Sequence, residues 1–460
     1  MSIVLFEKVL VLLDSIQERV EQIDKAKSFV ELDVIFEELG NVANAIKSVQ
    51  GVQKLLGLSS TSAGAERLQT SIAGMVNEKV LEKNFDTFRQ EFLEWAEVIR
   101  NYCKSKLQVP ELSHFPESDR ILIGMLTDTV ESSPLKIACA YVAFYENADF
   151  FYFTPNDIDY ERRLIAGLFY QNNEWIPQLV RYPDVIYDRL RLRGFDVAAR
   201  VYDEFAGTPF TNERPGNSMS KLEAYDKLLA TGQFDHVIIP YERATSLDVI
   251  IDYLERYKMI ILKPEIGSFG KQVFFITETD DNQFFIAERG NNQKMSHENL
   301  MKFLSNVVGN GHFIVQKYIM TRTRESKPFD IRVHLMKNGL DEWSIVILYP
   351  RIGIHFAVIS STGDGGYLGG WPGFIKRNFP ECNFAEIDEE IRSLCLNIAK
   401  TFESLCDERV NEIALDIAID RNLNLYLIEL NANMPGMIYY EFDVARHAIP
   451  YATFLAKSKT

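Results

Sequence analysis

The stretch ALDIAIDRNLNLYLIELNAN, residues 414–433, contains two apolar segments separated by a polar tetrapeptide. A tight turn at Arg421–Asn424 would fold the two segments against each other as neighbouring strands. Asp416 would then face Glu429 across the ladder. Because the side chains of a strand alternate between its two faces, Glu429 and Asn431 project from the same face. Three oxygen-bearing side chains are therefore expected to converge on one spot.

These three side chains predict a metal site. Oxygen ligands suit Mg²⁺, which binds carboxylates together with nucleotide phosphate oxygens and keeps some of its waters. A polar strand face that only meets solvent is the alternative interpretation. The flanking residues are strongly apolar, however, and ionised groups among them need a counter-charge. We therefore predict that Asp416, Glu429 and Asn431 bind Mg²⁺.

A second motif is MIILKPEIGSFGKQVFFI, residues 259–276. It predicts a buried strand that ends at Lys263, a loop with Gly267, Ser268 and Gly270, and another strand. Glycines let backbone N–H groups approach phosphate oxygens closely, and a lysine supplies a point charge. The loop is not a Walker A motif, because it joins two strands and no Gly-Lys-Ser/Thr follows it. The motif predicts a phosphate-binding loop, with a plain hairpin turn as the alternative.

A third motif is HFIVQKYI, residues 312–319. The end of such a strand can serve as the hinge against which an adenine ring lies, with backbone groups contacting the base edge and Lys317 nearby. A core strand that carries one lysine is the alternative interpretation.

Composition excludes several classes of protein. The chain has 460 residues, 47% of them hydrophobic, which predicts two to four domains. A net charge of −16 argues against an extended nucleic-acid surface. The N-terminal segment 1–22 carries charged residues, so it predicts neither a signal peptide nor a membrane span. The five cysteines lack CxxC spacing, which suggests no zinc knuckle or disulfide framework and fits a reducing cytoplasm.

The spacing of apolar residues and the positions of proline and small residues divide the chain into four parts. Residues 1–108 form a helical module by apolar spacing, in which the small-residue stretch 57–71 interrupts the helices. Residues 109–134 have the composition of a connector. Residues 135–218 predict an α/β domain, and residues 219–455 an α+β domain with many antiparallel hairpins.

Individual elements follow from the same patterns. IACAYVAFY (137–145), DFFYFTP (149–155) and DVIYDRL (184–190) have strand composition, whereas ERRLIAGLFY (161–170) predicts a helix. Lys337–Gly339 and Asn422–Asn424 mark hairpin turns. Further strands are predicted at residues 259–264, 272–278, 312–319, 330–336, 343–350, 413–420 and 424–431.

These motifs carry a family resemblance. A strand with Lys-Pro and a glycine-rich loop, then Gln-Lys-Tyr-Ile, Asp-Ile-Arg and Asp…Glu-x-Asn-x-x-Pro-Gly, resemble the ATP-grasp superfamily in order and spacing. DVIYDRL, SKLEAYDKLL and the Ile-Ile-Pro before the first ATP-binding strand resemble its spore-coat-associated YheC/YheD-type branch. The resemblance covers about residues 135–455. It implies an α+β fold class, with an α/β pre-ATP-grasp domain, a two-subdomain ATP-grasp fold and an extra all-α N-terminal domain.

The resemblance also implies roles for single residues. Lys221 and Lys263 resemble the two phosphate-contacting lysines, Gly267–Lys271 the loop over the β- and γ-phosphates, and Gln316–Ile319 the adenine hinge. The thirteen-residue spacing from Asp416 to Glu429 matches the family's metal hairpin. The implied ATP-binding residues are Lys221, Lys263, Gly267, Ser268, Gly270, Lys271, Gln316, Lys317, Tyr318 and Ile319.

Two arginines complete the predicted catalytic set with Lys263. Arg332 and Arg351 lie on neighbouring predicted strands, where guanidinium groups can neutralise a transferred phosphoryl group and an acyl-phosphate. Surface salt bridges are the alternative. His334 shares the face of Arg332, although a lone strand histidine is more often structural.

One departure from the family concerns the residues before Asp416. Many ligases of the superfamily carry an arginine just before the first metal carboxylate, whereas here Asn411–Leu415 contain none. The acyl-phosphate contact must therefore come from elsewhere, and Arg332 and Arg351 are the candidates. The glycine-rich stretch Ser360–Gly373 predicts an acceptor-side loop or a long surface turn.

The leading hypothesis is an ATP- and Mg²⁺-dependent carboxylate-amine ligase that works through an acyl-phosphate. An ATP-binding coat-assembly protein with little turnover and an ATP-dependent phosphotransferase are the alternatives. The expected partners are small-molecule or peptide carboxylates and amines, with no nucleic acid and no membrane. The N-terminal helices are candidates for homodimerisation or protein docking. The expected location is cytoplasmic, with spore association implied by the resemblance.

Overall fold

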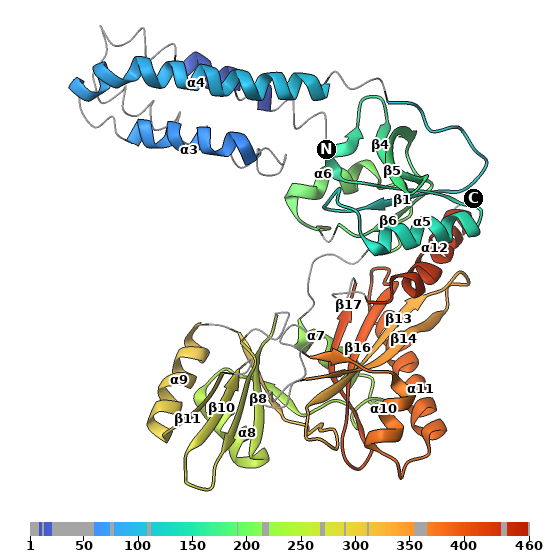
Figure 1. Ribbon diagram of the computed structural model, residues 1–460. Helices are drawn as coiled ribbons and strands as arrows, with labels where there is room; N and C mark the ends of the chain where they lie inside the picture. The colour runs from blue at the N-terminus through green and yellow to red at the C-terminus, as the bar shows by residue number, and fades with distance from the viewer. Residues whose placement is uncertain are drawn as a thin grey trace. The chain divides into compact units, whose positions relative to one another are not determined.

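The structure is a computed structural model, drawn in Figure 1. It describes two compact units, one drawn from Met1–Glu117, Phe153–Leu168 and Ile176–Tyr182, the other from Ser118–Tyr152, Phe169–Trp175 and Pro183–Thr460. The described residues are 9–11, 13–20, 59–73, 78–107, 112–190, 192–213, 220–266, 272–288, 291–310, 312–353, 366–433 and 439–458.

The helices of the first unit are amphipathic. Helix α4, Glu78–Leu107, buries a largely aromatic stripe at three and four spacing, which agrees with the apolar spacing that predicts helices in this part of the chain. Its buried residues include Phe88, Phe92, Trp95, Ala96 and Ile99. The predicted interruption at 57–71 is wrong, because Ser59–Ala73 form helix α3. Ala65, Leu68 and Ile72 are buried there at helical spacing, which outweighs the serine and threonine content.

The first sheet has six strands. Strand β1 pairs in parallel with β6, β3 pairs with β4, and β4 and β5 pair with each other and contribute residues to both units. The stretch predicted as a connector, residues 109–134, contains β1. The strands are β1 Leu122–Leu126, β2 Asp149–Phe153, β3 Ile158–Asp159, β4 Leu164–Gln171, β5 Glu174–Arg181 and β6 Val185–Asp188.

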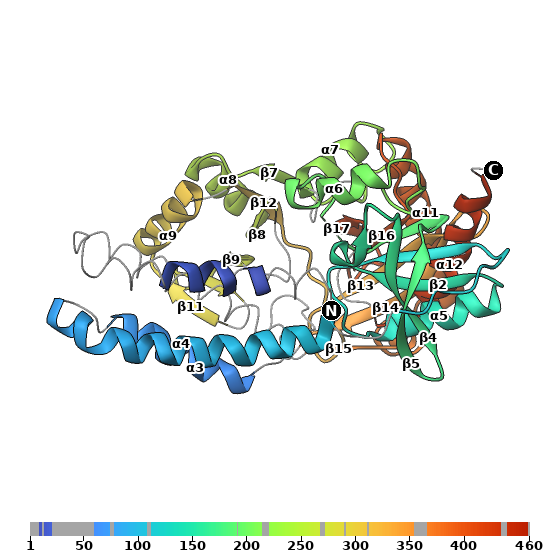
Figure 2. The same ribbon diagram turned by 90° about the horizontal axis from the view of Figure 1, so that it is seen from above.

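The helices around these strands are α5 Pro134–Tyr145, η1 Pro155–Asp157, α6 Asp196–Glu204 and α12 Glu441–Ser458. Helices α5 and α12 lie side by side, as Figures 1 and 2 show.

Two predicted elements of this region are exchanged. Residues 137–145, read as strand-like, lie in helix α5, because Ser133 caps its N-terminus and Pro134 occupies its first turn. Residues 161–170, read as helical, lie mostly in β4, where burial alternates along the strand. A short apolar run does not distinguish a buried helix from a strand, so the caps and the alternation of burial decide.

The second sheet has the strand order β11-β10-β9-β8-β12-β7. Helices α8 and α9 cover one of its faces, where they share an apolar core with the sheet (Figure 1). The elements are β7 Tyr241–Arg243, α8 Leu247–Tyr257, β8 Met259–Pro264, β9 Phe274–Glu278, β10 Phe284–Glu288, β11 Asn291–Met295, α9 His297–Asn310 and β12 Phe313–Lys317.

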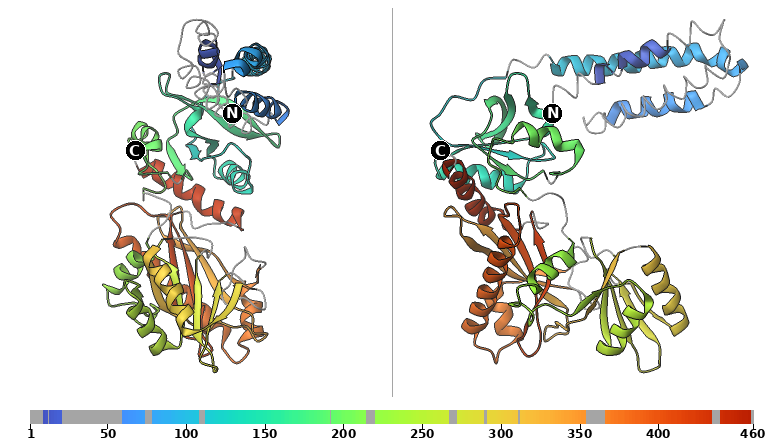
Figure 3. Two further views of the ribbon diagram at one scale, coloured as in Figure 1. Left: turned by 90° about the vertical axis from the view of Figure 1, so that its left-hand side faces the viewer. Right: turned by 180° about the vertical axis from the view of Figure 1, so that it is seen from behind.

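The third sheet is antiparallel, with the order β15-β14-β13-β16-β17. Helices α10 and α11, drawn in orange in Figure 3, pack along it, and α7 packs against α11 and β17. The predicted turns at Lys337–Gly339 and Asn422–Asn424 are confirmed as the β13–β14 and β16–β17 hairpins. The elements are α7 Lys221–Leu229, β13 Phe329–Lys337, β14 Trp343–Ile352, β15 Tyr367–Leu368, α10 Trp371–Asn378, α11 Phe384–Ser404, β16 Glu412–Ile419 and β17 Leu425–Ala432.

Candidate nucleotide and metal site

The two faces of the third sheet differ in chemistry. Ile331 and Val333 on β13, with Leu415 and Ile417 on β16, belong to the large apolar core of this unit. Arg332 and Asp416, which alternate with these residues on their strands, carry charge and pair directly across the ladder. Ionised side chains therefore line one face of a sheet whose other face is part of a hydrophobic core.

The β16–β17 hairpin places the predicted metal ligands together. Asp416 pairs with Glu429, as the sequence predicts. The register shifts at this point, because Ile417 pairs with Leu427 and Ile428 is left as the extra residue of a β-bulge. The bulge brings Glu429, rather than Ile428, opposite Asp416. It also frees the carbonyl group of Ile428 from the ladder.

Lys263 at the end of β8 reaches this freed carbonyl. Its Nζ lies 3.3 Å from the carbonyl oxygen of Ile428 and 3.3 Å from the hydroxyl of Tyr225, which also donates to Ile428. Burial lowers the pKa of Lys263 to about 8, although Glu429 and Asp416 oppose that shift. The second and third sheets therefore meet at a buried ammonium group beside the acidic hairpin.

Lys221 approaches the same hairpin from helix α7. Ser220 caps that helix by accepting a hydrogen bond from the backbone N–H of Glu223, which fixes Lys221 as its first residue. The Nζ of Lys221 lies 3.3 Å from Oε1 of Glu429, and the lysine is buried. Both lysines named from the sequence thus lie beside the predicted metal ligands.

Arg332 and Arg351 converge on the other carboxylate. Arg332 Nε lies 3.0 Å from Oδ1 of Asp416, and Arg351 Nη2 lies 2.8 Å from Oδ2. Arg351 also makes a two-pronged pair with Asp330, at 2.7 Å for each contact. Burial alone would lower the pKa of Arg351, but Asp330 and Asp416 raise it well above its usual value. The two arginines therefore belong to a buried ion-pair network, and the alternative of surface salt bridges is wrong.

This network has unused hydrogen-bonding capacity. Among the described residues, Nη1 of Arg332 and Oδ1 of Asp416 are buried without a hydrogen-bond partner. The 3.0 Å contact between Arg332 and Oδ1 is an ion pair whose geometry is not that of a hydrogen bond. Buried polar atoms without partners are costly, so these two atoms can take a water, an ion or a ligand as their partner.

The predicted adenine hinge lies on β12 and just after it. Gln316 is buried near the Tyr225 hydroxyl, its Nε2 has no hydrogen-bond partner among the described residues, and Lys317 Nζ lies 5.6 Å from the centre of the Tyr257 ring. The Tyr318 ring packs edge-on against Phe275 at 4.8 Å, and Ile319 is half-buried. Gln316 thus adjoins the same tyrosine that contacts Lys263.

Several predicted residues lie outside the described part of the chain. These are Gly267, Ser268, Gly270 and Lys271, together with residues 360–365 of the predicted acceptor-side loop. The remainder of that stretch is not all loop, because it contains β15 and the first turn of α10. Pro372 in the first turn of α10 suits a helix start.

The donor set fits Mg²⁺ bound together with a phosphate. Within the described residues no group of three or more His, Cys, Asp or Glu side chains forms a metal cluster. The hairpin offers two carboxylates and the amide of Asn431, a half-buried residue that pairs with Ala414 beside Asp416. Mg²⁺ is commonly held by one or two carboxylates plus substrate phosphate oxygens and waters.

Sequence reasoning missed a second charged cluster on this sheet. Glu412 at the start of β16 accepts from Arg189 Nη1 at 2.8 Å, and its other oxygen lies 2.9 Å from His334 Nε2. Arg189 follows strand β6 of the first sheet, so 223 residues separate it from Glu412. No local pattern signals such a contact. His334, considered above as a functional candidate, belongs to this buried cluster.

Comparison with known proteins places the chain in a family. The family model described as YheC/D like ATP-grasp matches residues 207–454, more than half of the chain. The chain belongs to the YheC/D-like ATP-grasp family. Relatives include two Bacillus subtilis (strain 168) proteins. Endospore coat-associated protein YheD is 22% identical over 329 residues, covering 67% of this chain and 70% of that protein. Endospore coat-associated protein YheC is 22% identical over 312 residues, covering 62% and 80%.

Solved structures include D-cycloserine synthetase DcsG, with 13% identity and a TM-score of 0.43, covering 74% of this chain and 100% of that one. The ATP-grasp part corresponds to the second and third sheets, and the first 108 residues precede the region matched by the family model. Among the described helices of this family member, none is long and apolar enough to span a lipid bilayer.

Proposed function

We propose that this chain is an ATP- and Mg²⁺-dependent ligase that joins a carboxylate to an amine through an acyl-phosphate. The observation that carries the proposal is the convergence of Lys221, Lys263 and Arg332 on the Asp416–Glu429 hairpin. Two buried polar atoms there, Arg332 Nη1 and Asp416 Oδ1, have no hydrogen-bond partner among the described residues. Membership of the ATP-grasp family supports the same conclusion.

In this proposal the lysines bind the nucleotide. Lys263 and Lys221 neutralise the phosphates of ATP, while the β12 end from Gln316 to Ile319 holds the adenine. Asp416, Glu429 and Asn431 would hold Mg²⁺, which would supply charge neutralisation to the phosphates. Phosphoryl transfer depends mainly on positioning and charge, so this set suffices without a protein nucleophile.

Arg332 takes the role of the arginine that is missing before Asp416. Arg332 pairs with Asp416 across the ladder, so its guanidinium reaches the Asp416 carboxylate from the neighbouring strand β13. Its Nη1 has no hydrogen-bond partner among the described residues and can donate to an anionic oxygen. Arg332 therefore stabilises the acyl-phosphate. Arg351, which is bound to Asp330 and Asp416, holds the carboxylate of Asp416 in place.

The proposed reaction has two steps, formation of an acyl-phosphate and its conversion to an amide. A substrate carboxylate oxygen attacks the γ-phosphorus and ADP leaves, which forms the acyl-phosphate. The amine then attacks the acyl carbon, phosphate leaves and the amine loses a proton. The products are an amide or peptide, ADP and phosphate. We propose small molecules or peptides as substrates, in a cytoplasmic or spore-associated protein.

The test uses the full chain, Mg-ATP and a small-molecule extract as the source of carboxylates and amines. ADP and free phosphate should appear together, and mass spectrometry should detect new species lighter by one water than the summed substrates. Phosphate found attached to an acceptor would instead indicate a phosphotransferase. Absence of ADP with every substrate pool would contradict the ligase.

A second candidate is an ATP-binding coat-assembly protein with little turnover. The names of YheC and YheD, both endospore coat-associated, favour it. This candidate predicts Mg-ATP binding without ADP release, and co-sedimentation of the chain with isolated spore coats. Substrate-stimulated ADP release would decide for the ligase.

A further inference from the structure

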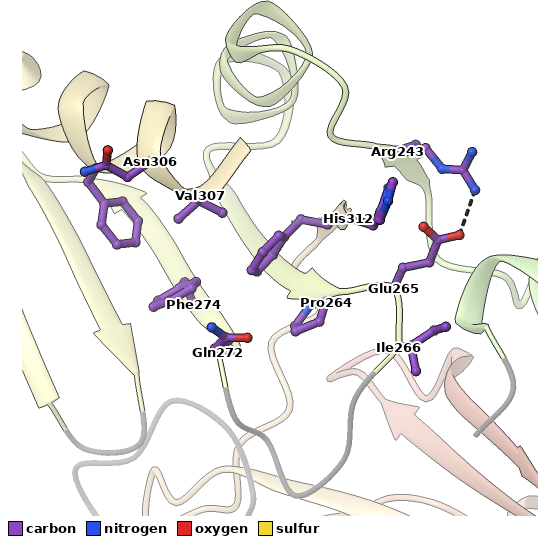
Figure 4. A pocket seen from close by; sticks show the side chains of 11 residues that line it. Arg243, Pro264, Glu265, Ile266, Gln272, Phe274, Asn306, Val307 and His312 are labelled. Atoms are coloured by element: carbon purple, nitrogen blue, oxygen red, sulfur yellow. Dashed lines mark hydrogen bonds and ion pairs between the residues drawn. The ribbon is translucent and has the colours of Figure 1, made fainter. Parts of the chain in front are cut away.

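A cavity of about 690 Å³ lies at one end of the second sheet, beside helix α9 (Figure 4). Pro264 and Phe313 pair across β8 and β12, and both line the cavity. Their neighbours on this face belong to the core under α8 and α9, whereas the side chain of Lys263 reaches Tyr225 from the opposite face. The cavity is therefore separate from the proposed phosphate site.

Aromatic rings form the walls of this cavity. Phe274 packs edge-on against Phe303 at 5.0 Å and lies nearly parallel to Phe313 at 6.5 Å. Val307 of α9 and Pro264 of β8 complete the apolar lining. The volume falls within the range of about 300–1,000 Å³ that is usual for small-molecule sites. A flat ring placed here would extend an existing aromatic cluster.

The rim of the cavity is polar but carries compensated charge. Arg243 and Glu265 form an ion pair at 2.6 Å, which is drawn as a dashed line in Figure 4. The amide side chain of Gln272 lies on another part of the rim, and His312 lines the cavity near Arg243 (Figure 4). An anionic or cationic ligand would have to compete with the ion pair, whereas amides can donate to and accept from a neutral ring edge.

We propose that this cavity binds a neutral aromatic heterocycle, of the class that includes indoles and nucleobases. The aromatic walls receive the faces of the ring, and the amide group of Gln272 contacts its polar edge. This binding does not depend on the proposed ligase function.

Glu265 links the cavity to the nucleotide site. Its carboxylate accepts from the hydroxyl of Ser220 at 3.2 Å, and its backbone carbonyl accepts from the N–H of Lys221 at 3.1 Å. Lys221 in turn contacts Glu429. A ligand that shifts Glu265 therefore changes the position of Lys221. A change in Mg-ATP affinity is the expected consequence, and this second readout rests on the proposed function.

The test is a titration of the full chain with 5-fluoroindole, followed by ¹⁹F NMR and calorimetry. The wild type should bind with saturation at one site. Val307→Phe, which fills the cavity, should weaken binding at least about tenfold, equal to about 1.4 kcal/mol. Ser305→Phe places the same ring on an exposed position of the same helix and should leave binding unchanged.

A further variant guards against misfolding of Val307→Phe. Phe303→Leu removes one aromatic wall and keeps an apolar side chain, so it should weaken binding about threefold to tenfold. No saturable binding by the wild type, or equal binding by the wild type and both cavity variants, would overturn the proposal. If Mg-ATP binding fails while 5-fluoroindole still binds, the ligase function fails and the cavity site stands.

Discussion

Two acidic residues four positions apart on β16 have opposite surroundings. Both oxygens of Glu412 are engaged, by Arg189 at 2.8 Å and His334 at 2.9 Å, and only 1% of the residue is exposed. Asp416 faces two arginines, yet one of its oxygens and one nitrogen of Arg332 have no hydrogen-bond partner among the described residues. The same face of one sheet thus has a satisfied end and an unsatisfied end.

The ion pairs of Glu412 and Asp416 therefore suit different roles, the first in stability and the second in ligand binding. A buried ion pair that is fully bonded needs nothing more, and it joins β16 to the end of β6. A buried ion pair whose donors and acceptors are not all hydrogen-bonded can bind a further partner. We therefore propose that the Glu412 end serves stability and that the Asp416 end, with Glu429, serves nucleotide chemistry. Four substitutions or conditions test this division.

The largest effect is expected for Glu429→Gln. The change keeps the shape of the side chain but removes the charge that would hold Mg²⁺ and pair with Lys221. Turnover of Mg-ATP should fall about 1,000-fold, or roughly 4 kcal/mol. Because a quarter of the side chain is exposed, the urea midpoint should change little. ADP release measures the effect, and turnover within tenfold of the wild type would remove Glu429 from the site.

Glu412→Gln should lower stability and leave nucleotide affinity nearly unchanged, which is the opposite of the effect of Glu429→Gln. It leaves the guanidinium of Arg189 buried without its anion, so the free energy of unfolding should fall by about 3–5 kcal/mol. Mg-ATP affinity of the folded variant should stay within about twofold of the wild type. Urea denaturation and calorimetry provide the two readouts. Lost nucleotide affinity with unchanged stability would reverse the division between the two ends.

Arg332→Lys should affect turnover more than folding. Lysine keeps the charge but loses the second donor that reaches toward the substrate, so turnover should fall about 10- to 100-fold. Arg351→Lys is the matched variant, since it breaks the two-pronged pair with Asp330 and should lower stability instead. Parallel kinetics and urea curves measure both. Equal profiles for the two variants would contradict the separate roles.

The smallest effect is a pH dependence of nucleotide affinity. Burial lowers the pKa of Lys263 in the free protein to about 8, so the amine is charged below that pH and loses its proton above it. Binding of phosphates above pH 8 then requires uptake of a proton, and affinity should decline by up to about tenfold per pH unit. Lys263→Arg keeps its charge and should give a flat profile over pH 7–9. A wild-type profile that rises with pH would contradict this account.

The β16–β17 hairpin could be predicted because its signals are local. The polar turn and the alternation along each strand predict the hairpin, but the pairing of Asp416 with Glu429 depends on the bulge, because an unshifted register would place Ile428 opposite Asp416. The bulge at Ile428 was not predictable, since it depends on how the ladder accommodates a shifted register. Residues 137–145 were misread because a short apolar run fits both helix and strand.

The Glu412 cluster shows a different limit. Arg189 and Glu412 are 223 residues apart, and only the packing of separate elements joins them. His334 therefore seemed a lone strand histidine in the sequence, although its partner lies on the adjacent strand. The roles proposed for Lys221, Lys263, Arg332, Arg351 and Asn431 remain predictions that the contacts support.

The central claim is that Mg-ATP binds at the Asp416–Glu429 hairpin between the second and third sheets. Calorimetric titration of the full chain with ATP, in the presence and absence of Mg²⁺, tests it most directly. Saturable binding at one site that strengthens with Mg²⁺ is expected for the wild type. A complete lack of nucleotide binding with Mg²⁺ present would contradict it.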